Sequence, residues 1–145
     1  MDAITLLEQD HRAVEALFKK FEDSEDPVVQ VETAALICKM LQVHTSIEEE
    51  LFYPKARKVL AKEDDDDLVD EAVHEHAMAK ELIEKIQTMK AGLLLTGAIK
   101  MLKMAIEHHV KEEETEMFPE LKQLGMETVQ LGTQLETRKT QLMSA

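Results

Sequence analysis

Apolar residues recur every three or four positions along four long stretches of this chain, which is the spacing of one face of an α-helix. The first two stretches cover about residues 3–21 and 28–61, and the fourth ends near Leu124. A tail from Met126 onward, rich in Leu and Gln, predicts a short additional helix. The pattern therefore predicts a protein built from helices alone.

Three short segments separate the four helical patterns. EDSEDP ends the first pattern, and its Pro27 suits the first turn of the next helix. The run KEDDDD at residues 62–67 lacks the central Gly and alternating ligands of a calcium-binding loop, so it predicts a solvated loop and an acidic helix start. Gly92 and Gly97 predict the third turn, although TGAIK around Gly97 also fits a helix.

Each predicted helix has a stripe of mainly apolar residues along one face, and such stripes are buried when helices pack together. We call this the inward stripe. We predict an all-α fold: an up-down antiparallel four-helix bundle over residues 1–124, with a short C-terminal helix in a tail over residues 125–145. Pro54 predicts a kink in the second helix, because proline lacks a backbone N–H and crowds the preceding turn. The predicted inward positions are Leu7, His11, Val14, Phe18, Phe21, Ile37, Leu41, His44, Glu48, Leu51, Val69, Val73, His76, Ile83, Ile86, Leu102, Ile106, His109 and Glu113.

Composition and charge narrow the class of protein. Apolar residues make up 44% of the chain and aromatic residues only 3%, with few Gly and Pro, which suits helices. The net charge of −13 opposes binding to nucleic acid, because phosphates repel an acidic surface. The single cysteine, Cys38, lies in an apolar run and predicts a core residue. We see no signal peptide and no apolar run that could span a bilayer, so we expect a cytoplasmic protein without membrane partners.

Two segments of the chain nearly repeat each other. HTSIEEELFYP begins at His44 and HVKEEETEMFP begins at His109, and each has a Glu four residues after its His. A further histidine, His11 or His76, precedes each segment by 33 residues. The repeat predicts two equivalent helix pairs, each pairing one histidine with a His–Glu motif.

The spacing of the repeat points to metal chemistry. A His and a Glu four residues apart project from the same helix face, so each repeated pair can hold one ion. The two upstream histidines lie on inward stripes and complete a two-metal site of the kind found in bundle cores. Imidazole suits iron, zinc, copper or nickel, and a carboxylate can bridge two ions. The six candidate ligands are His11, His44, Glu48, His76, His109 and Glu113.

A purely structural bundle with buried histidines is an alternative. An inward histidine is often satisfied in a core without any metal. An unpaired buried carboxylate is costly, however, so two inward glutamates at matched offsets favour metal binding.

These motifs resemble the hemerythrin-like HHE cation-binding family. The resemblance rests on LLEQDHRAVEALF, HTSIEEELFYP, HEHAMAKELI and HHVKEEETEMFP, and it covers Thr5 to about Leu121. It implies an up-down four-helix bundle holding two non-haem iron ions, bridged by carboxylates and oxygen. It also implies that the six candidate residues are the iron ligands.

The chain departs from the oxygen carriers of that family in two ways. Those proteins have a fifth histidine four residues from the one on the third helix, where this chain has Ala72 and Lys80. They also end with His and Asp five apart, whereas His109 and Glu113 are four apart. The resemblance therefore implies a diiron protein that acts on or senses dioxygen, peroxide or nitric oxide, rather than a simple oxygen carrier. Catalase- or peroxidase-like activity and a non-catalytic iron- or oxygen-binding or storage module are both open.

Three neighbouring residues carry weaker signals. His74 lies two residues from His76, on nearly the opposite face, and predicts a surface residue. Only the register of the repeat favours His109 over the adjacent His108 as a site residue. Tyr53 matches Phe118 and predicts packing, although a phenol near iron could ligate it or quench radicals. A ferritin-like site built on two Glu-x-x-His motifs fits less well, since one of its ligand positions would be a lysine.

Overall fold

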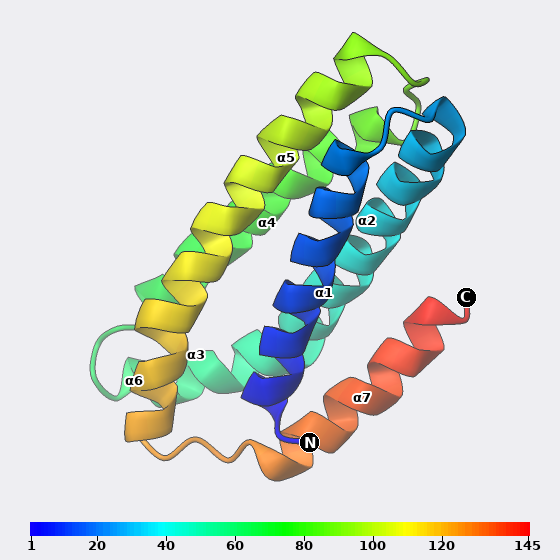
Figure 1. The fold of residues 1–145 in the computed structure, drawn as a ribbon. Coiled ribbons are helices and arrows are strands. Elements are labelled where there is room, and N and C mark those ends of the chain that lie inside the picture. Colours follow the sequence, from blue (N-terminus) through cyan, green and yellow to red (C-terminus); the bar gives the residue numbers. More distant parts are fainter.

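The computed structural model describes residues 1–145, and every regular element in it is a helix (Figure 1). The long helices are α1 (Ala3–Asp23), α2 (Pro27–Ile47), α4 (Asp67–Ile86) and α5 (Leu93–Glu112). The short elements are the π-helical turns η1 (Glu48–Phe52) and η2 (Glu113–Met117), and the helices α3 (Tyr53–Ala61), α6 (Phe118–Gln123) and α7 (Val129–Met143). The predicted all-α bundle with a C-terminal helix is confirmed.

The long helices pack antiparallel, each against two neighbours: α2 and α5 flank α1, and the same two helices flank α4. Local signals begin the first two helices. The carboxylates of Asp2 and Asp26 accept the backbone N–H groups of Thr5 at 3.0 Å and Val28 at 2.9 Å. Pro27 lies in the first turn of α2, as predicted. The first two helices therefore begin where capping residues and Pro27 occur in the sequence.

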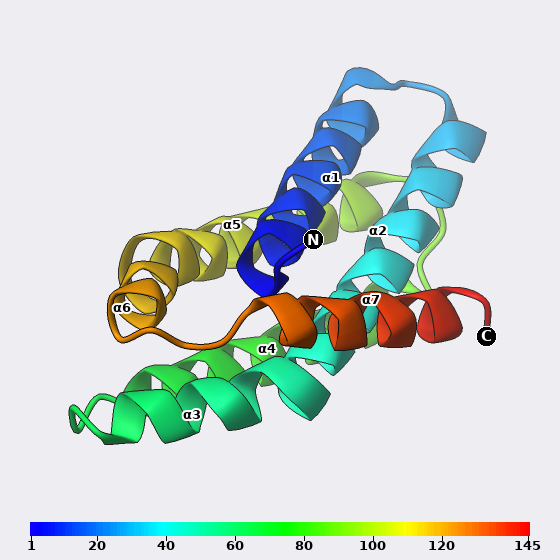
Figure 2. The same ribbon diagram turned by 90° about the horizontal axis from the view of Figure 1, so that it is seen from below.

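Each half of the chain has a π-helical turn that begins at the glutamate of its His–Glu motif and ends two residues before its proline. The residue after each turn donates its backbone N–H to the carbonyl five residues earlier, from Tyr53 to Glu48 in the first half and from Phe118 to Glu113 in the second. The wider turn suits the approach to Pro54 and Pro119, since proline offers no N–H and crowds the carbonyl four residues earlier. Figures 1 and 2 show α3 turning away from the axis of α2, so the predicted kink is present.

Two apolar clusters fill the bundle, with a layer of buried polar residues between them. On α1, Leu7 belongs to one cluster and Val14 to the other, while His11 lies in the polar layer. The same order of cluster, histidine and cluster recurs on α2 and α4, whereas after His109 on α5 the chain reaches the other cluster only at Met117 in η2. Cys38 is a buried core residue, as predicted, and burial raises the pKa of its thiol to about 11. The fold thus gathers the repeated motifs into one layer.

Helix α7 docks against the bundle. Leu131 and Leu135 are completely buried in the apolar cluster that also contains residues of α1, α3 and α6. Gly132 lies against the first residues of the chain, where a Cβ would come within 2.1 Å of the Met1 carbonyl oxygen. Figure 2 shows α7 running across α2 and past the N-terminal end of α1. The tail therefore contributes to the core, while the division of the chain into a bundle domain and a tail stays a prediction.

Two details of the sequence prediction need comment. Val73 was predicted to face inward, but it is 38% exposed, so this prediction is wrong. The adjacent Ala72 takes the inward position, four residues before the buried His76. Gly92 alone marks the third turn, with a φ of 144° that favours glycine, while Gly97 lies inside α5. None of the helices combines the length and apolar character that crossing a membrane requires.

Candidate metal centre

All six candidate ligands lie in the polar layer and are buried. One histidine comes from each long helix, and each glutamate begins a π-helical turn. Their donor atoms form two groups, within each of which the atoms lie within 4.8 Å of one another. The His11 triad is His11, His44 and Glu113, and the His76 triad is Glu48, His76 and His109. Each triad therefore draws residues from both halves of the chain.

The two glutamates connect the triads. Glu48 places Oε1 3.1 Å from Nε2 of His44 and 3.2 Å from Nε2 of His76. Glu113 places its two oxygens 3.2 and 3.4 Å from the Nε2 atoms of the other two histidines. Each carboxylate reaches both triads, which is the placement that a carboxylate bridging two ions requires.

Four donor atoms in this layer are buried without a hydrogen-bond partner. They are Nε2 of His11, Nε2 of His44, Oε2 of Glu48 and Oε1 of Glu113. His11 Nε2 and Glu113 Oε1 approach to 3.2 Å, and His44 Nε2 and Glu48 Oε1 to 3.1 Å, but neither contact has hydrogen-bond alignment. Buried polar atoms are normally hydrogen-bonded, so four unpartnered atoms in one layer require a reason. Imidazole nitrogens and carboxylate oxygens are common ligands of transition metals, and the residues present fit a pair of such ions.

Every histidine of the triads binds a second carboxylate through Nδ1, the nitrogen turned away from the triads. The pairs are His11 with Glu114 at 2.6 Å, His44 with Asp10 at 2.9 Å, His76 with Glu49 at 2.7 Å and His109 with Glu75 at 2.8 Å. Such outer carboxylates fix the ring orientation and raise the basicity of the nitrogen that faces a metal. None of these four carboxylates was predicted from the sequence.

Each outer carboxylate also contacts a cationic or protonatable side chain. The contacts are Arg12 with Glu114 at 2.5 Å, Lys80 with Glu49 at 2.8 Å, His108 with Glu75 at 3.3 Å, and Lys139 with Asp10. The hydrogen bond from His76, together with Lys80, lowers the pKa of Glu49 to about 2. Lys80, which occupies one position where the oxygen carriers could have their fifth histidine, thus supports His76 through Glu49.

Burial and neighbouring charge act in opposite directions on the site residues. Burial lowers the pKa of His44, but the carboxylates of Glu48 and Asp10 outweigh it and raise the pKa to about 10. Glu113 likewise outweighs the effect of burial and raises the pKa of His109 well above its usual value. These rings hold protons strongly, so a metal ion must compete with protons for their nitrogens.

Tyr53 also lies in the polar layer. Its hydroxyl donates to Glu113 Oε2 at 2.6 Å and lies 3.3 Å from Glu48 Oε1. Burial and the two carboxylates raise the pKa of this phenol well above its usual value. Phe118, at the matching position, has no hydroxyl and stacks on His11 with ring centroids 6.1 Å apart. The packing predicted for Tyr53 is therefore accompanied by a hydrogen bond into the site.

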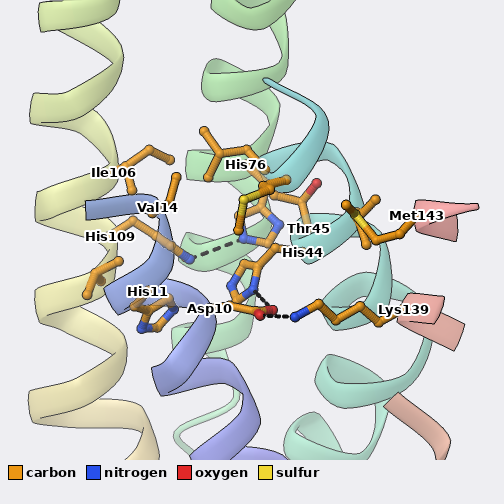
Figure 3. A pocket seen from close by; sticks show the side chains of 14 residues that line it. Asp10, His11, Val14, His44, Thr45, His76, Ile106, His109, Lys139 and Met143 are labelled. Atoms are coloured by element: carbon orange, nitrogen blue, oxygen red, sulfur yellow. Dashed lines mark hydrogen bonds and ion pairs between the residues drawn. The ribbon is translucent and has the colours of Figure 1, made fainter. Parts of the chain in front are cut away.

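A cavity of about 200 Å³ adjoins the triads (Figure 3). Its walls include the four triad histidines together with Val14, Ile106 and other apolar side chains of α1, α2 and α5. Lys139 and Met143 of α7 complete the lining on one side. The cavity leaves room for a small molecule beside the candidate metal centre.

The two remaining histidines lie outside the triads. His74 is exposed, as predicted. The His108 side chain is 63% exposed and contacts the partly exposed Glu75 and Glu112. The repeat register therefore selected the buried histidines on α4 and α5 correctly.

The fold and the triads define a helical-bundle protein with a core suited to a dinuclear metal site. A model of the hemerythrin HHE cation binding domain matches residues 2–128. The chain therefore belongs to the hemerythrin HHE cation-binding domain family. A solved structure of a hemerythrin HHE cation binding domain-containing protein from Mycobacterium kansasii has the same fold. It gives a TM-score of 0.81 at 21% identity and covers 99% of this chain and 88% of that chain.

Two curated relatives are longer than this chain. A DNA nickase of Nostoc sp. is 26% identical over 145 residues, which are 98% of this chain and 40% of the relative. An uncharacterized hemerythrin-like protein of Schizosaccharomyces pombe is 28% identical over 112 residues, 77% of this chain and 55% of the relative. The chain thus spans about half the length of these relatives, or less.

Proposed function

We propose that this chain binds two iron ions, one at each triad, and presents them to dioxygen, peroxide or nitric oxide. The observation that carries the proposal is the set of four unpartnered donor atoms buried in the polar layer. The six residues of the two triads would hold these ions. An iron pair supplies redox chemistry and coordination positions for a small ligand.

The surrounding residues support such a site. The four outer carboxylates hold the imidazole rings so that Nε2 faces the triads. The Tyr53 hydroxyl, 2.6 Å from Glu113, is a buried proton donor at the site. The largely apolar walls of the cavity favour a small, weakly polar ligand over a large or charged one. A peroxide-removing enzyme and a sensor or storage module would use the same ligands, and both versions belong to the proposal.

We also propose that nucleic acid is not a partner of this chain. The name DNA nickase belongs to a relative of which the chain covers 40%. The net charge of −13 opposes contact with phosphates. A DNA-binding titration at low salt should therefore detect no complex.

The proposal is tested by loading the protein with ferrous iron without oxygen and measuring bound metal and the ultraviolet-visible spectrum after oxygen is admitted. We expect two iron ions per chain and an absorption band that is absent from the His44→Ala variant. His74→Ala is the control and should bind iron normally. Steady consumption of hydrogen peroxide would identify the enzyme version, and stable binding without turnover the sensor or storage version. A wild-type protein that takes up no iron would refute the proposal.

A further inference from the structure

Two consecutive basic residues of α7 reach elements that carry triad residues. Arg138 donates to Glu50 in η1, from Nε at 2.7 Å and from Nη2 at 3.2 Å. Lys139 donates to one oxygen of Asp10, and the other oxygen of Asp10 lies 2.9 Å from Nδ1 of His44. Asp10 is only 6% exposed, so Lys139 partners a nearly buried carboxylate. The Asp10 side chain therefore links Lys139 of α7 to His44.

The same part of α7 closes the cavity. Lys139 and Met143 both line it, and Figure 3 shows their side chains extending from α7 toward α2 and Asp10. The Lys139 side chain is 34% exposed, whereas the histidines on the opposite walls are buried. The α7 side is thus where the cavity lies nearest to solvent.

We propose that Lys139 is a positioning residue for His44 and that, together with Met143, it makes α7 the outer wall of the ligand cavity. Through Asp10 it fixes the His44 ring, and through its bulk it slows the passage of a small ligand to the metal centre. The inference rests on the proposed function, because the wall matters only if a ligand binds at the triads.

Two other side chains separate these roles. Lys80 contacts Glu49 at 2.8 Å, and Glu49 lies 2.7 Å from Nδ1 of His76, so this lysine has the same link to a triad histidine. It does not line the cavity. Met143 lines the cavity but forms no hydrogen bond with Asp10 or Glu49. Lys80→Ala therefore isolates positioning, and Met143→Ala isolates the wall.

The experiment compares Lys139→Ala with these two variants by three measurements. The first records the imidazole nitrogen resonances of His44 and His76 by NMR in protein stripped of metal. The second is the affinity for ferrous iron. The third is the association rate constant of nitric oxide with the iron(II)-loaded protein, measured by stopped-flow absorbance. Nitric oxide is uncharged, so its rate reports access rather than attraction to Lys139.

Lys139→Ala should shift the His44 resonances, lower the iron affinity by about tenfold and raise the nitric oxide rate constant by about tenfold. Lys80→Ala should shift the His76 resonances and lower the affinity without changing the rate. Met143→Ala should raise the rate only, and Lys139→Arg should restore the His44 resonances.

Unchanged His44 resonances in Lys139→Ala would overturn the positioning role. A nitric oxide rate in Lys139→Ala equal to that in Lys80→Ala would overturn the wall. A wild-type protein that binds no iron would refute the proposed function, and with it the wall, while the metal-free resonances would still decide the positioning role.

Discussion

The two halves of the bundle have the same candidate ligands but different surroundings. His11, His44 and Glu48 in the first half correspond to His76, His109 and Glu113 in the second, and each outer carboxylate has a counterpart in the other half. The halves differ at Tyr53, which faces both site glutamates, where the second half has Phe118.

They differ also in what holds the equivalent outer carboxylates. Asp10 contacts Lys139 from the C-terminal helix, whereas Glu75 contacts the exposed His108 of the neighbouring helix. The cavity lies on the side that α7 covers. The repeat thus sets the positions of the candidate ligands, while the residues that differ between the halves supply the buried hydroxyl and the α7 lining of the cavity.

Removing equivalent candidate ligands should weaken iron binding more than any other single substitution. Because His44 and His109 occupy the same position in the two halves, His44→Ala and His109→Ala should each lower the iron affinity by more than about 100-fold, beyond the loss of an outer partner. Metal analysis after gel filtration measures this, with His74→Ala as the control. If one variant lost iron and the other kept two ions, the two halves would not be equivalent.

Metal removal should affect the whole bundle. The polar layer lies between two apolar clusters, and without a metal its carboxylates and imidazoles lose their common partner. Iron at 100 times the dissociation constant of one site stabilises the fold by about 2.7 kcal/mol, or roughly 5–10 °C in Tm. Thermal unfolding with and without a chelator should show this drop, while far-ultraviolet circular dichroism at 20 °C keeps most of the helical signal. Coincident melting curves would contradict the account.

The pH dependence of binding follows from the raised pKa values of the histidines. With a pKa of about 10, His44 is protonated at neutral pH, and a metal ion must displace that proton. The iron affinity should therefore fall as pH falls, by about tenfold per unit for each displaced proton. Competition with a chelator of known affinity between pH 6 and 8 measures the slope, and a flat profile would contradict it.

The same shift has the opposite sign for the metal-free fold. A histidine whose pKa rises from 6.5 to about 10 on folding contributes its full stabilisation below pH 6.5 and loses it as pH rises toward 10. Urea unfolding of the stripped protein should show this contribution of His44 declining across that range. A His44→Gln variant should lack it.

The smallest expected effect concerns the difference between Tyr53 and Phe118. Tyr53→Phe makes the halves alike and removes the hydrogen bond to Glu113, which should cost about 1–3 kcal/mol in the metal-free protein. Iron should still bind, because the ligands remain. Urea unfolding and metal analysis test both statements, and Phe118→Leu serves as a packing control that touches no hydrogen bond. An unchanged free energy of unfolding in Tyr53→Phe would show that the hydrogen bond contributes nothing.

The sequence predicted much of this layer because the repeat preserves its offsets. Six polar residues on four apolar stripes could only be buried together, so their convergence followed from helical periodicity. Asp10 and Glu75 precede the first histidine of each half, and Glu49 and Glu114 follow each glutamate, so extending the repeat by one residue would have found them.

Other features depend on three-dimensional packing that no local pattern encodes. Glu114 lies 103 residues from His11, and Lys139 lies 129 residues from Asp10. These contacts form only after the helices and the tail have docked. Val73 was wrongly predicted to be buried for a related reason. It lies beside the inward stripe of its helix, so its exposure depends on how that helix is rotated against its neighbours, which the sequence pattern does not determine. The repeat therefore predicted the candidate ligands, whereas their supporting contacts depend on packing.

The six buried residues are proposed to act together as one two-metal site. An anaerobic titration with ferrous iron, followed by equilibrium metal analysis, tests this proposal most directly in the wild-type protein and in the double variant Glu48→Ala/Glu113→Ala. The account predicts saturation at two ions per wild-type chain and loss of both ions in the double variant, since each glutamate reaches both triads. Saturation at two ions in both proteins, or no saturable binding in the wild type, would contradict it.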